Sequence, residues 1–321
     1  MRYTPTSASN HPREDAVVPS DPLEISDLIV DYDIATLRPR PVSRSAVVAR
    51  LEANGQRSAA RLVQGLPASN DTLDSEACGA ALLRSHIELQ RLSEEFLQAD
   101  RLRAVLVPLL QALRDSGVKP PLRVVDVGCG LGYAVRALAA HGRLGRDVEL
   151  IGCDMNVTLI EGARRLAEEE SLTCELKVAN AFQLQQPGHV FISTGVMHHF
   201  RGDDLNAFFA GQRPGYAFVH YDIQRSVVAP LGSWLFHQAR MREPLARHDG
   251  VVSARRVHST QTLLSAARSA SGFTCASLDG ARSFIGVILR PMTATLGARA
   301  ELWEPLLRRL GPLRSRLGPT R

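Results

Sequence analysis

The chain has 321 residues, of which 45% are hydrophobic, and this suffices for one sizeable core or for one core with a smaller helical cap. Its formal net charge of +5 would suit a nucleic-acid partner. However, every basic residue except Lys119 and Lys177 is an arginine, and the arginines are scattered rather than gathered in a stripe. We therefore do not predict binding to nucleic acid. The arginine-for-lysine composition, with abundant alanine, is typical of a GC-rich bacterial genome.

Cysteine spacing and hydropathy further restrict the class of protein to which the chain can belong. The five cysteines are widely spaced and odd in number, they lack the Cys/His spacing of zinc sites, and they fit free thiols in a reducing compartment. No apolar run approaches the ~20 residues that a bilayer-spanning helix needs. The first 21 residues lack the apolar core of a secretory signal. The sequence predicts a cytoplasmic protein with no membrane partner, and it leaves the oligomeric state open, with a homodimer as one alternative.

The N-terminal third predicts a disordered tail followed by a helical cap. Residues 1–22 hold four prolines among polar residues and form the tail, and residues 23–118 form the cap. Within the cap, residues 23–34 are expected to dock as a short helix or strand, and residues 44–65 to be helical with an interruption at Gly55. Residues 81–117 carry a stronger helical pattern that we expect to be kinked or split at Pro108. Six apolar residues share one face of it: Leu102, Val105, Leu106, Leu109, Leu110 and Leu113.

From Leu122 onward strands and helices alternate. This order predicts a doubly wound, mostly parallel sheet with helices on both faces, and we place the catalytic domain at residues 119–292. The expected strands are residues 123–127, 148–153, 175–179, 189–193 and 216–222, and the expected helices are residues 133–141, 156–170 and 203–211.

The C-terminal part of this domain predicts different elements. Residues 229–245 read as a helix inside an insertion that spans residues 229–258, and residues 259–270 form another helix. Two strands at residues 273–278 and 284–289, with a turn at Gly280, predict an antiparallel hairpin that closes the sheet. Residues 293–321 are expected to form an extension.

The motif richest in glycine follows the first strand of the alternating region. Residues 125–133 read V-D-V-G-C-G-L-G-Y, a buried strand that turns into a helix through glycines. Glycine allows a ligand to approach the backbone closely, and ligands bind at the carboxyl ends of strands in such sheets. A dinucleotide-binding loop would require glycine where Tyr133 stands, which counts against a nicotinamide or flavin cofactor.

Polar residues follow the next two strands. Asp154 ends the second strand, where a carboxylate accepts hydrogen bonds from both ribose hydroxyls of a nucleoside, although it could instead cap the following helix. Asn180, Ala181 and Phe182 follow the third strand, where an amide and a ring suit an adenine, although these residues taken alone favour a simple turn.

The fourth strand ends at Ser193 and Thr194 and leads to the histidine pair His198 and His199. No carboxylate lies at ligand spacing from this pair, so no metal site is predicted. One imidazole is a candidate base, because its pKa lies near neutrality, and Asp222 at the end of the fifth strand is the group expected to orient it. The alternative is a pair of structural histidines at the sheet edge.

Together these motifs resemble the class I S-adenosylmethionine-dependent methyltransferases, and among them the small-molecule group that includes the ubiquinone and menaquinone methyltransferases. The resemblance covers residues 121–290 and implies a seven-stranded sheet with S-adenosylmethionine as cofactor. In that family the glycine loop wraps the methionine part, the acid after the second strand binds the ribose, and the next residue packs on the adenine. Asn180 departs from the family, which often has aspartate at this place. The implied cofactor-binding residues are Asp126, Gly128, Cys129, Gly130, Gly132, Asp154, Met155, Asn180, Ala181, Phe182, Ser193 and Thr194.

The resemblance implies methyl transfer to an oxygen or carbon atom of a small aromatic, quinone-like or polyketide acceptor. The tetrapeptide D/N-P-P-Y/F of amino-group methylases of nucleic-acid bases is replaced by Ser-Thr-Gly-Val at residues 193–196, and no glutamate pair of protein-arginine methylases is present there. We expect His198 or His199 to take the proton of the acceptor, with Asp222 orienting the imidazole or the substrate. Three alternatives stay open: a nucleotide-linked oxidoreductase, a non-catalytic cofactor-binding partner protein, and an RNA methylase.

Overall fold

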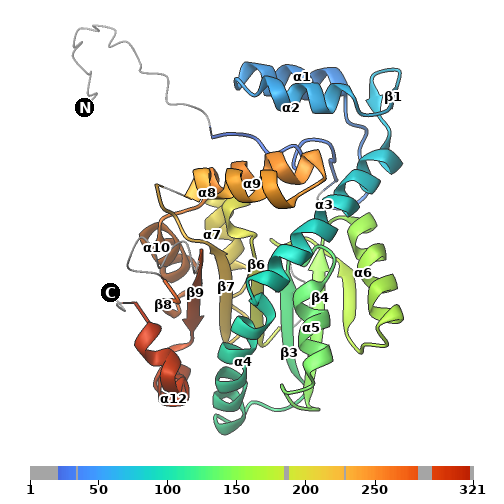
Figure 1. Cartoon of the computed structure of the whole chain (residues 1–321). Coiled ribbons are helices and arrows are strands. Elements are labelled where there is room, and N and C mark those ends of the chain that lie inside the picture. The colour runs from blue at the N-terminus through green and yellow to red at the C-terminus, as the bar shows by residue number, and fades with distance from the viewer. Residues whose placement is uncertain (1–20, 34, 184–187, 228, 281–290, 319–321) are drawn as a thin grey trace, which may run out of the picture.

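A computed structural model describes residues 21–33, 35–183, 188–227, 229–280 and 291–318. Its centre is a seven-stranded sheet in the order β5-β4-β3-β6-β7-β9-β8 (Figure 1). The strands are β3 (Leu122–Val127), β4 (Val148–Asp154), β5 (Glu175–Val178), β6 (Val190–Thr194), β7 (Ala217–Ile223), β8 (Thr274–Leu278) and β9 (Met292–Ala298).

The sheet is parallel except at one edge. The strands β5, β4, β3, β6 and β7 run in one direction, while β9 pairs antiparallel with both β7 and β8. The strand order reverses at β3, whose two neighbours are β4 and β6. In an open α/β sheet this reversal opens a crevice beyond the carboxyl ends of the strands, and ligands bind there. The predicted doubly wound sheet with a late antiparallel hairpin is confirmed.

Helices cover both faces because the strands are apolar on both sides. One face packs on α4 (Gln98–Asp115), α5 (Tyr133–His141), α6 (Val157–Glu169) and α12 (Ala300–Arg309), and the other packs on α7 (Asp203–Ala210) and α10 (Thr260–Ser271). Val124 belongs to the first core and Val125 to the second, as the alternation of side chains along a strand requires. The helices packed on its two faces therefore hold the sheet in place.

The cap consists of α1 (Arg44–Ala53), α2 (Arg57–Gln64), a short hairpin of β1 (Ala68–Ser69) and β2 (Thr72–Leu73), and α3 (Ser75–Glu95), which leads into α4. The alternative of a split at Pro108 is wrong, because α4 runs through this proline. The chain breaks instead at Leu97, which adopts a left-handed backbone with φ 52°. None of the described helices is long and apolar enough to span a bilayer.

The insertion is two helices rather than one, α8 (Ala229–Arg240) and α9 (Pro244–Arg256), and they lie across the upper end of the sheet beside α3 (Figure 1). The second strand of the terminal hairpin is β9, so the sheet extends to Ala298; the predicted strand at residues 284–289 lies outside the described residues. A 3-10 turn (Gly311–Arg316) follows α12. Of the predicted tail, residues 1–20 also lie outside the described part.

A third core joins the cap to the sheet domain. It holds Ile25 and Ile29 from the segment before α1, Leu82 from α3 and Leu245 from α9, together with Leu131 at the end of the glycine loop. The segment of residues 21–32 docks here through a turn, not through the helix or strand expected from its pattern. The cap, together with α8 and α9, therefore covers the carboxyl ends of the strands, and we call this cover the roof.

Candidate functional site

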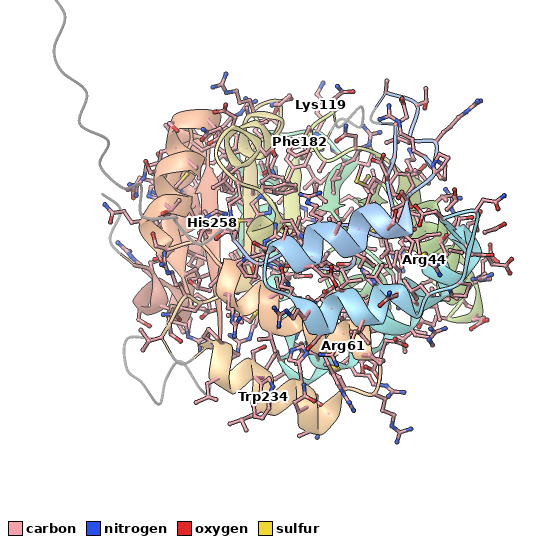
Figure 2. The ribbon with its side chains drawn as sticks, turned by 90° about the horizontal axis from the view of Figure 1, so that it is seen from above. Arg44, Arg61, Lys119, Phe182, Trp234 and His258 are labelled. Carbon is pink, nitrogen blue, oxygen red and sulfur yellow. The ribbon has the colours of Figure 1, made fainter. Side chains whose placement is uncertain are left out.

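A cavity of about 940 Å³ lies between the carboxyl ends of the strands and this roof. The glycine loop, the ends of β4, β5 and β6, the helices α3, α8 and α9, and the segment before α1 all contribute to its wall. Figure 2 looks down on the roof, with α1 and α2 nearest the viewer and Trp234 of α8 at the periphery. Trp234 is half-exposed and does not line the cavity, so the apolar wall on α8 comes from Phe236 instead.

The glycine loop approaches its neighbours too closely for any side chain. A Cβ atom on Gly128 would lie 2.9 Å from the Val196 side chain, and one on Gly130 would lie 2.8 Å from the imidazole of His86. Both glycines also have positive φ, which strains any other residue. The bare backbone at Gly128, Cys129 and Gly130 lines the cavity, and this cradle fits a ligand that rests on the main chain.

Asp154 is tied to the loop. Its Oδ2 accepts a hydrogen bond from the Gly130 N–H at 2.9 Å, and its Oδ1 accepts one from the Asn156 N–H at 2.9 Å. The next helix is capped by Asn156, whose side chain accepts from the Leu159 N–H, so Asp154 is not needed as a cap. Asp154 and Met155 both line the cavity, where a carboxylate can meet ribose hydroxyls.

Asn180 offers an unsatisfied donor. Its Oδ1 accepts from the Phe182 N–H at 2.9 Å, which fixes the orientation of the amide, and its buried Nδ2 has no hydrogen-bond partner among the described residues. A buried donor without a partner costs free energy, and a ring nitrogen of adenine would satisfy it. Phe182 and Ala181 line the cavity beside it. The arrangement therefore fits an adenosine-containing cofactor.

Four of the predicted site residues stand behind the wall. Gly132 packs against Leu176, and Ser193 is fully buried with its hydroxyl 2.9 Å from the His220 Nδ1. Asp126 and Asp222 are also buried and do not line the cavity. The remaining predicted residues do line it: Gly128, Cys129, Gly130, Asp154, Met155, Asn180, Ala181, Phe182, Thr194, His198 and His199.

His198 is held by Asp222 from behind. The Asp222 carboxylate accepts from the backbone N–H of His198 and lies 2.9 Å from its Nδ1. Burial would raise the pKa of Asp222, but His198 lowers it, so the carboxylate is ionised and Nδ1 carries the proton. Nε2 is the other ring nitrogen, and it faces the cavity, the position of a group that exchanges a proton or binds a metal.

Two acids from the segment before α1 meet the histidine pair, and sequence patterns did not single them out. Glu24 Oε1 lies 3.8 Å from the His198 Nε2, and Glu24 Oε2 lies 3.6 Å from the His199 Nδ1. Asp27 Oδ1 lies 3.1 Å from the same Nδ1. Burial alone would lower the pKa of His199, but Glu24 and Asp27 raise it to about 9. Burial raises the pKa of Glu24. This wall attracts cations.

Two further cap residues reach the cofactor end of the cavity. Tyr32 is nearly buried, and burial together with the Asp154 carboxylate raises its pKa to about 12. His86 lies against Gly130, and its Nδ1 donates to the Leu82 carbonyl at 2.9 Å, which leaves Nε2 as an acceptor. No motif marks either residue, because each lies far in sequence from the glycine loop. For Tyr32, the sequence signal was the pattern of acidic and apolar residues at positions 23–34.

Part of the chain is similar to known proteins. A family model described as a methyltransferase domain matches residues 124–213. No curated protein matches the chain. Similar solved structures include a plantazolicin methyltransferase in complex with SAH, with 9% identity, a TM-score of 0.45, and coverage of 70% of this chain and 97% of that one. Another is magnesium protoporphyrin IX methyltransferase from Synechocystis, with 15% identity, a TM-score of 0.43, and coverage of 80% and 100%. A third is a SAM-dependent methyltransferase from Aquifex aeolicus, with 13% identity, a TM-score of 0.40, and coverage of 63% and 97%.

Proposed function

We propose that this chain, a class I S-adenosylmethionine-dependent methyltransferase by its methyltransferase domain and its strand order, methylates an oxygen or carbon atom of a small, largely apolar acceptor. The acceptor is of an aromatic, quinone-like or polyketide kind and belongs to secondary metabolism. The free thiols of the five cysteines fit a reducing cytoplasm, where we place the reaction.

One observation carries the proposal: a single cavity joins the cofactor end to the histidine wall. Asp154 and Asn180 lie on the same cavity as His198, and the part under the roof is apolar, with Leu89, Phe96 and Phe236. A largely apolar pocket with a few converging polar groups is the usual form of a small-molecule site. The acceptor therefore binds under α3 and α8 with its reacting atom toward His198.

The charges of the wall favour a neutral acceptor. None of the described residues that line the cavity is lysine or arginine, whereas Glu24, Asp27, Asp31, Asp154 and Asp249 are acids. The cation on this wall, His199, is already paired with Glu24 and Asp27, so a carboxylate or phosphate would meet the acids without a free cationic partner, which costs free energy in a partly buried site. Phenols, hydroxyquinones and enols are uncharged until they lose a proton, and they suit the wall.

The roles of the residues follow from their positions. The cofactor supplies a methyl group bound to a sulfonium. The glycine loop, Asp154 and Asn180 hold the cofactor, and the roof reduces the access of bulk water to the acceptor. Asp222 positions His198, and the lone pair on Nε2 activates the acceptor hydroxyl. His199 stands beside it, with the two ring centroids 4.4 Å apart.

The test separates cofactor binding from turnover. Thermal stability and calorimetry with S-adenosylhomocysteine give the affinity, with NAD(P) as the comparison ligand. Transfer of labelled methyl groups to a panel of phenols, hydroxyquinones and enolised diketones gives the turnover. We expect Asp154→Ala to weaken the binding of S-adenosylhomocysteine roughly tenfold or more. His198→Ala should retain this binding and lose about a hundredfold in turnover.

His141→Ala serves as the matched control, because this histidine is exposed at the end of α5 and does not line the cavity. It should behave as the wild type in both assays. Methyl transfer at the wild-type rate by His198→Ala would refute the assigned role. Tight binding of S-adenosylhomocysteine with no methylated product across the panel would instead favour a non-catalytic cofactor-binding partner.

A further inference from the structure

The wall that faces the acceptor brings together three groups of the kind that bind metal ions. They are the Nε2 of His198, the Nδ1 of His199 and the carboxylate of Glu24, and their donor atoms all lie within 4.8 Å of one another. The Nε2 of His198 lies 3.8 Å from Glu24 Oε1, beyond hydrogen-bonding distance, so the two groups face each other without a direct hydrogen bond. An ion bound to both would lie between them.

The three donors are held in place from behind. Asp222 fixes the ring of His198 through Nδ1, which is the carboxylate–histidine arrangement that supports metal ligands in proteins. The Ser253 hydroxyl donates to Glu24 Oε1 at 3.1 Å, and Arg256 lies 3.4 Å from the same oxygen. Glu24 and His198 are 2% and 4% exposed, so this is a built, buried site rather than a chance group of surface acids.

The segment that carries Glu24 is also anchored. The Asp249 carboxylate accepts hydrogen bonds from the N–H groups of Ile25 and Ser26 at 2.8 and 2.9 Å. Ile25 is buried in the third core. The carboxylate of Glu24 is therefore presented to the histidines by a fixed backbone and not by a free chain end.

The acids around the cluster outnumber its arginine. Glu24, Asp27 and Asp222 face Arg256, which pairs with Glu24 and Asp27. Asp249 is compensated separately by two backbone N–H groups and His248. A divalent cation bound to Glu24 and the histidines would take the place of the proton on the His199 imidazole, so metal binding releases a proton.

We propose that Glu24, His198 and His199 bind a divalent cation at the acceptor end of the cavity. Two imidazoles and one carboxylate with open positions suit a first-row metal such as Zn²⁺ or Mn²⁺ rather than Ca²⁺ or Mg²⁺. Bonds of ~2.1 Å place neighbouring ligand atoms roughly 3.0–3.4 Å apart. The separations of 3.6 and 3.8 Å need only a small contraction to match this geometry.

This inference rests on the proposed function and deepens it for oxygen acceptors. The acceptor oxygen binds the cation as its O–H bond breaks, and the proton passes to solvent water. The oxygen then forms a bond to the methyl carbon as the carbon–sulfur bond breaks, and the electron pair of that bond stays on the sulfur. The cation thus replaces direct proton transfer to Nε2, and it favours acceptors with two adjacent oxygens, such as catechols and enolised diketones.

The experiment uses the full chain and measures metal first. Metal-stripped protein is titrated with Co²⁺, whose visible absorption reports imidazole and carboxylate ligands, and Zn²⁺ affinity follows by competition with a chromophoric chelator. We expect one ion per chain. Glu24→Gln and His199→Ala should each weaken binding at least tenfold, while His141→Ala leaves it unchanged. Thermal unfolding and the affinity for S-adenosylhomocysteine confirm that each variant is folded.

These measurements separate a failure of the metal site from a failure of the proposed methyltransferase function. Failure of the wild type to bind Co²⁺, Zn²⁺ or Mn²⁺ at one ion per chain would overturn the inference. So would full methyl-transfer activity of the stripped protein in the presence of chelator, and in that case the methyltransferase function itself would stand. Stoichiometric binding that depends on Glu24, together with loss of turnover on stripping and recovery on adding the metal back, would support it.

Discussion

At the scale of single residues, the site is built from polar groups whose partners lie behind the cavity wall. Asp222 does not touch the cavity, yet it decides which nitrogen of His198 carries a proton. Asp126 stands under the glycine loop in the same way, but its Oδ1 is buried and makes no hydrogen bond with any described residue. The two acids therefore differ in the free energy of their charged forms, although they occupy similar places near the carboxyl ends of two parallel strands, β3 and β7.

Asp126 leads to a prediction about pH. Burial, with the nearby Asp154 charge, raises its pKa to about 7 from an ordinary value near 3.8. The folded state therefore holds a proton that the unfolded state releases. The stability contributed by this group is present below about pH 4 and is lost as the pH rises to about 7, by up to ~1.4 kcal/mol per pH unit.

The variant that tests this is Asp126→Asn, which cannot ionise. Urea unfolding at pH 5 and at pH 7.5 gives the free energy of unfolding of both proteins. We expect the free energy of unfolding of the variant, relative to that of the wild type, to be larger at pH 7.5 than at pH 5 by about 2 kcal/mol. An unchanged difference at both pH values would mean that Asp126 keeps an ordinary pKa in the folded protein.

At the scale of elements, the alternating region follows its sequence pattern closely, and the cap does not. Helix α5 has the predicted bounds, and β3, β4 and β7 lie within a residue or two of theirs, because apolar runs and glycine turns are local signals. The usual cost of proline in a helix favours a kink or a split at Pro108. The packing of α4 against the sheet overrides that cost, and the chain turns at Leu97.

Leu97 yields a prediction for this junction. Its φ of 52° is left-handed, which costs a side-chain-bearing residue ~1 kcal/mol, and its side chain is largely exposed. Leu97→Gly should therefore raise the free energy of unfolding by about 0.5–1 kcal/mol. Leu97→Ala, which removes the same exposed side chain but keeps Cβ, should not. Equal stability of the two variants in chemical denaturation would show that the backbone at this junction is not strained.

At the scale of the whole molecule, the site exists only because distant parts of the chain meet. The glycine loop and Asp154 could be recognised from sequence, since each follows directly from one strand. Glu24 could not, because it is 174 positions from His198 and no local pattern encodes their contact. The absence of a carboxylate near the histidines in sequence led to the expectation of no metal ligand set. The fold supplies that carboxylate through the third core.

This dependence gives a last prediction. Ile25 is buried next to Glu24 and holds the segment of residues 21–32 against the roof, whereas Ile87 on α3 is 42% exposed. Truncating a buried isoleucine to alanine costs about 2–5 kcal/mol, which is enough to loosen a segment held by few contacts. Ile25→Ala should therefore be cleaved faster by protease within this segment. It should also bind S-adenosylhomocysteine several-fold more weakly, because Tyr32 no longer closes the cofactor end of the cavity.

Ile87→Ala removes the same atoms from an exposed position and should match the wild type in both measurements. Limited proteolysis followed by mass spectrometry locates the cleavage, and calorimetry gives the affinity. If Ile25→Ala were cleaved only outside residues 21–32, the segment would be held by other contacts, with the Asp249 hydrogen bonds to Ile25 and Ser26 as the first to remove. If cleavage rose within the segment while the affinity stayed unchanged, the cofactor end would be closed by α3 and His86 alone.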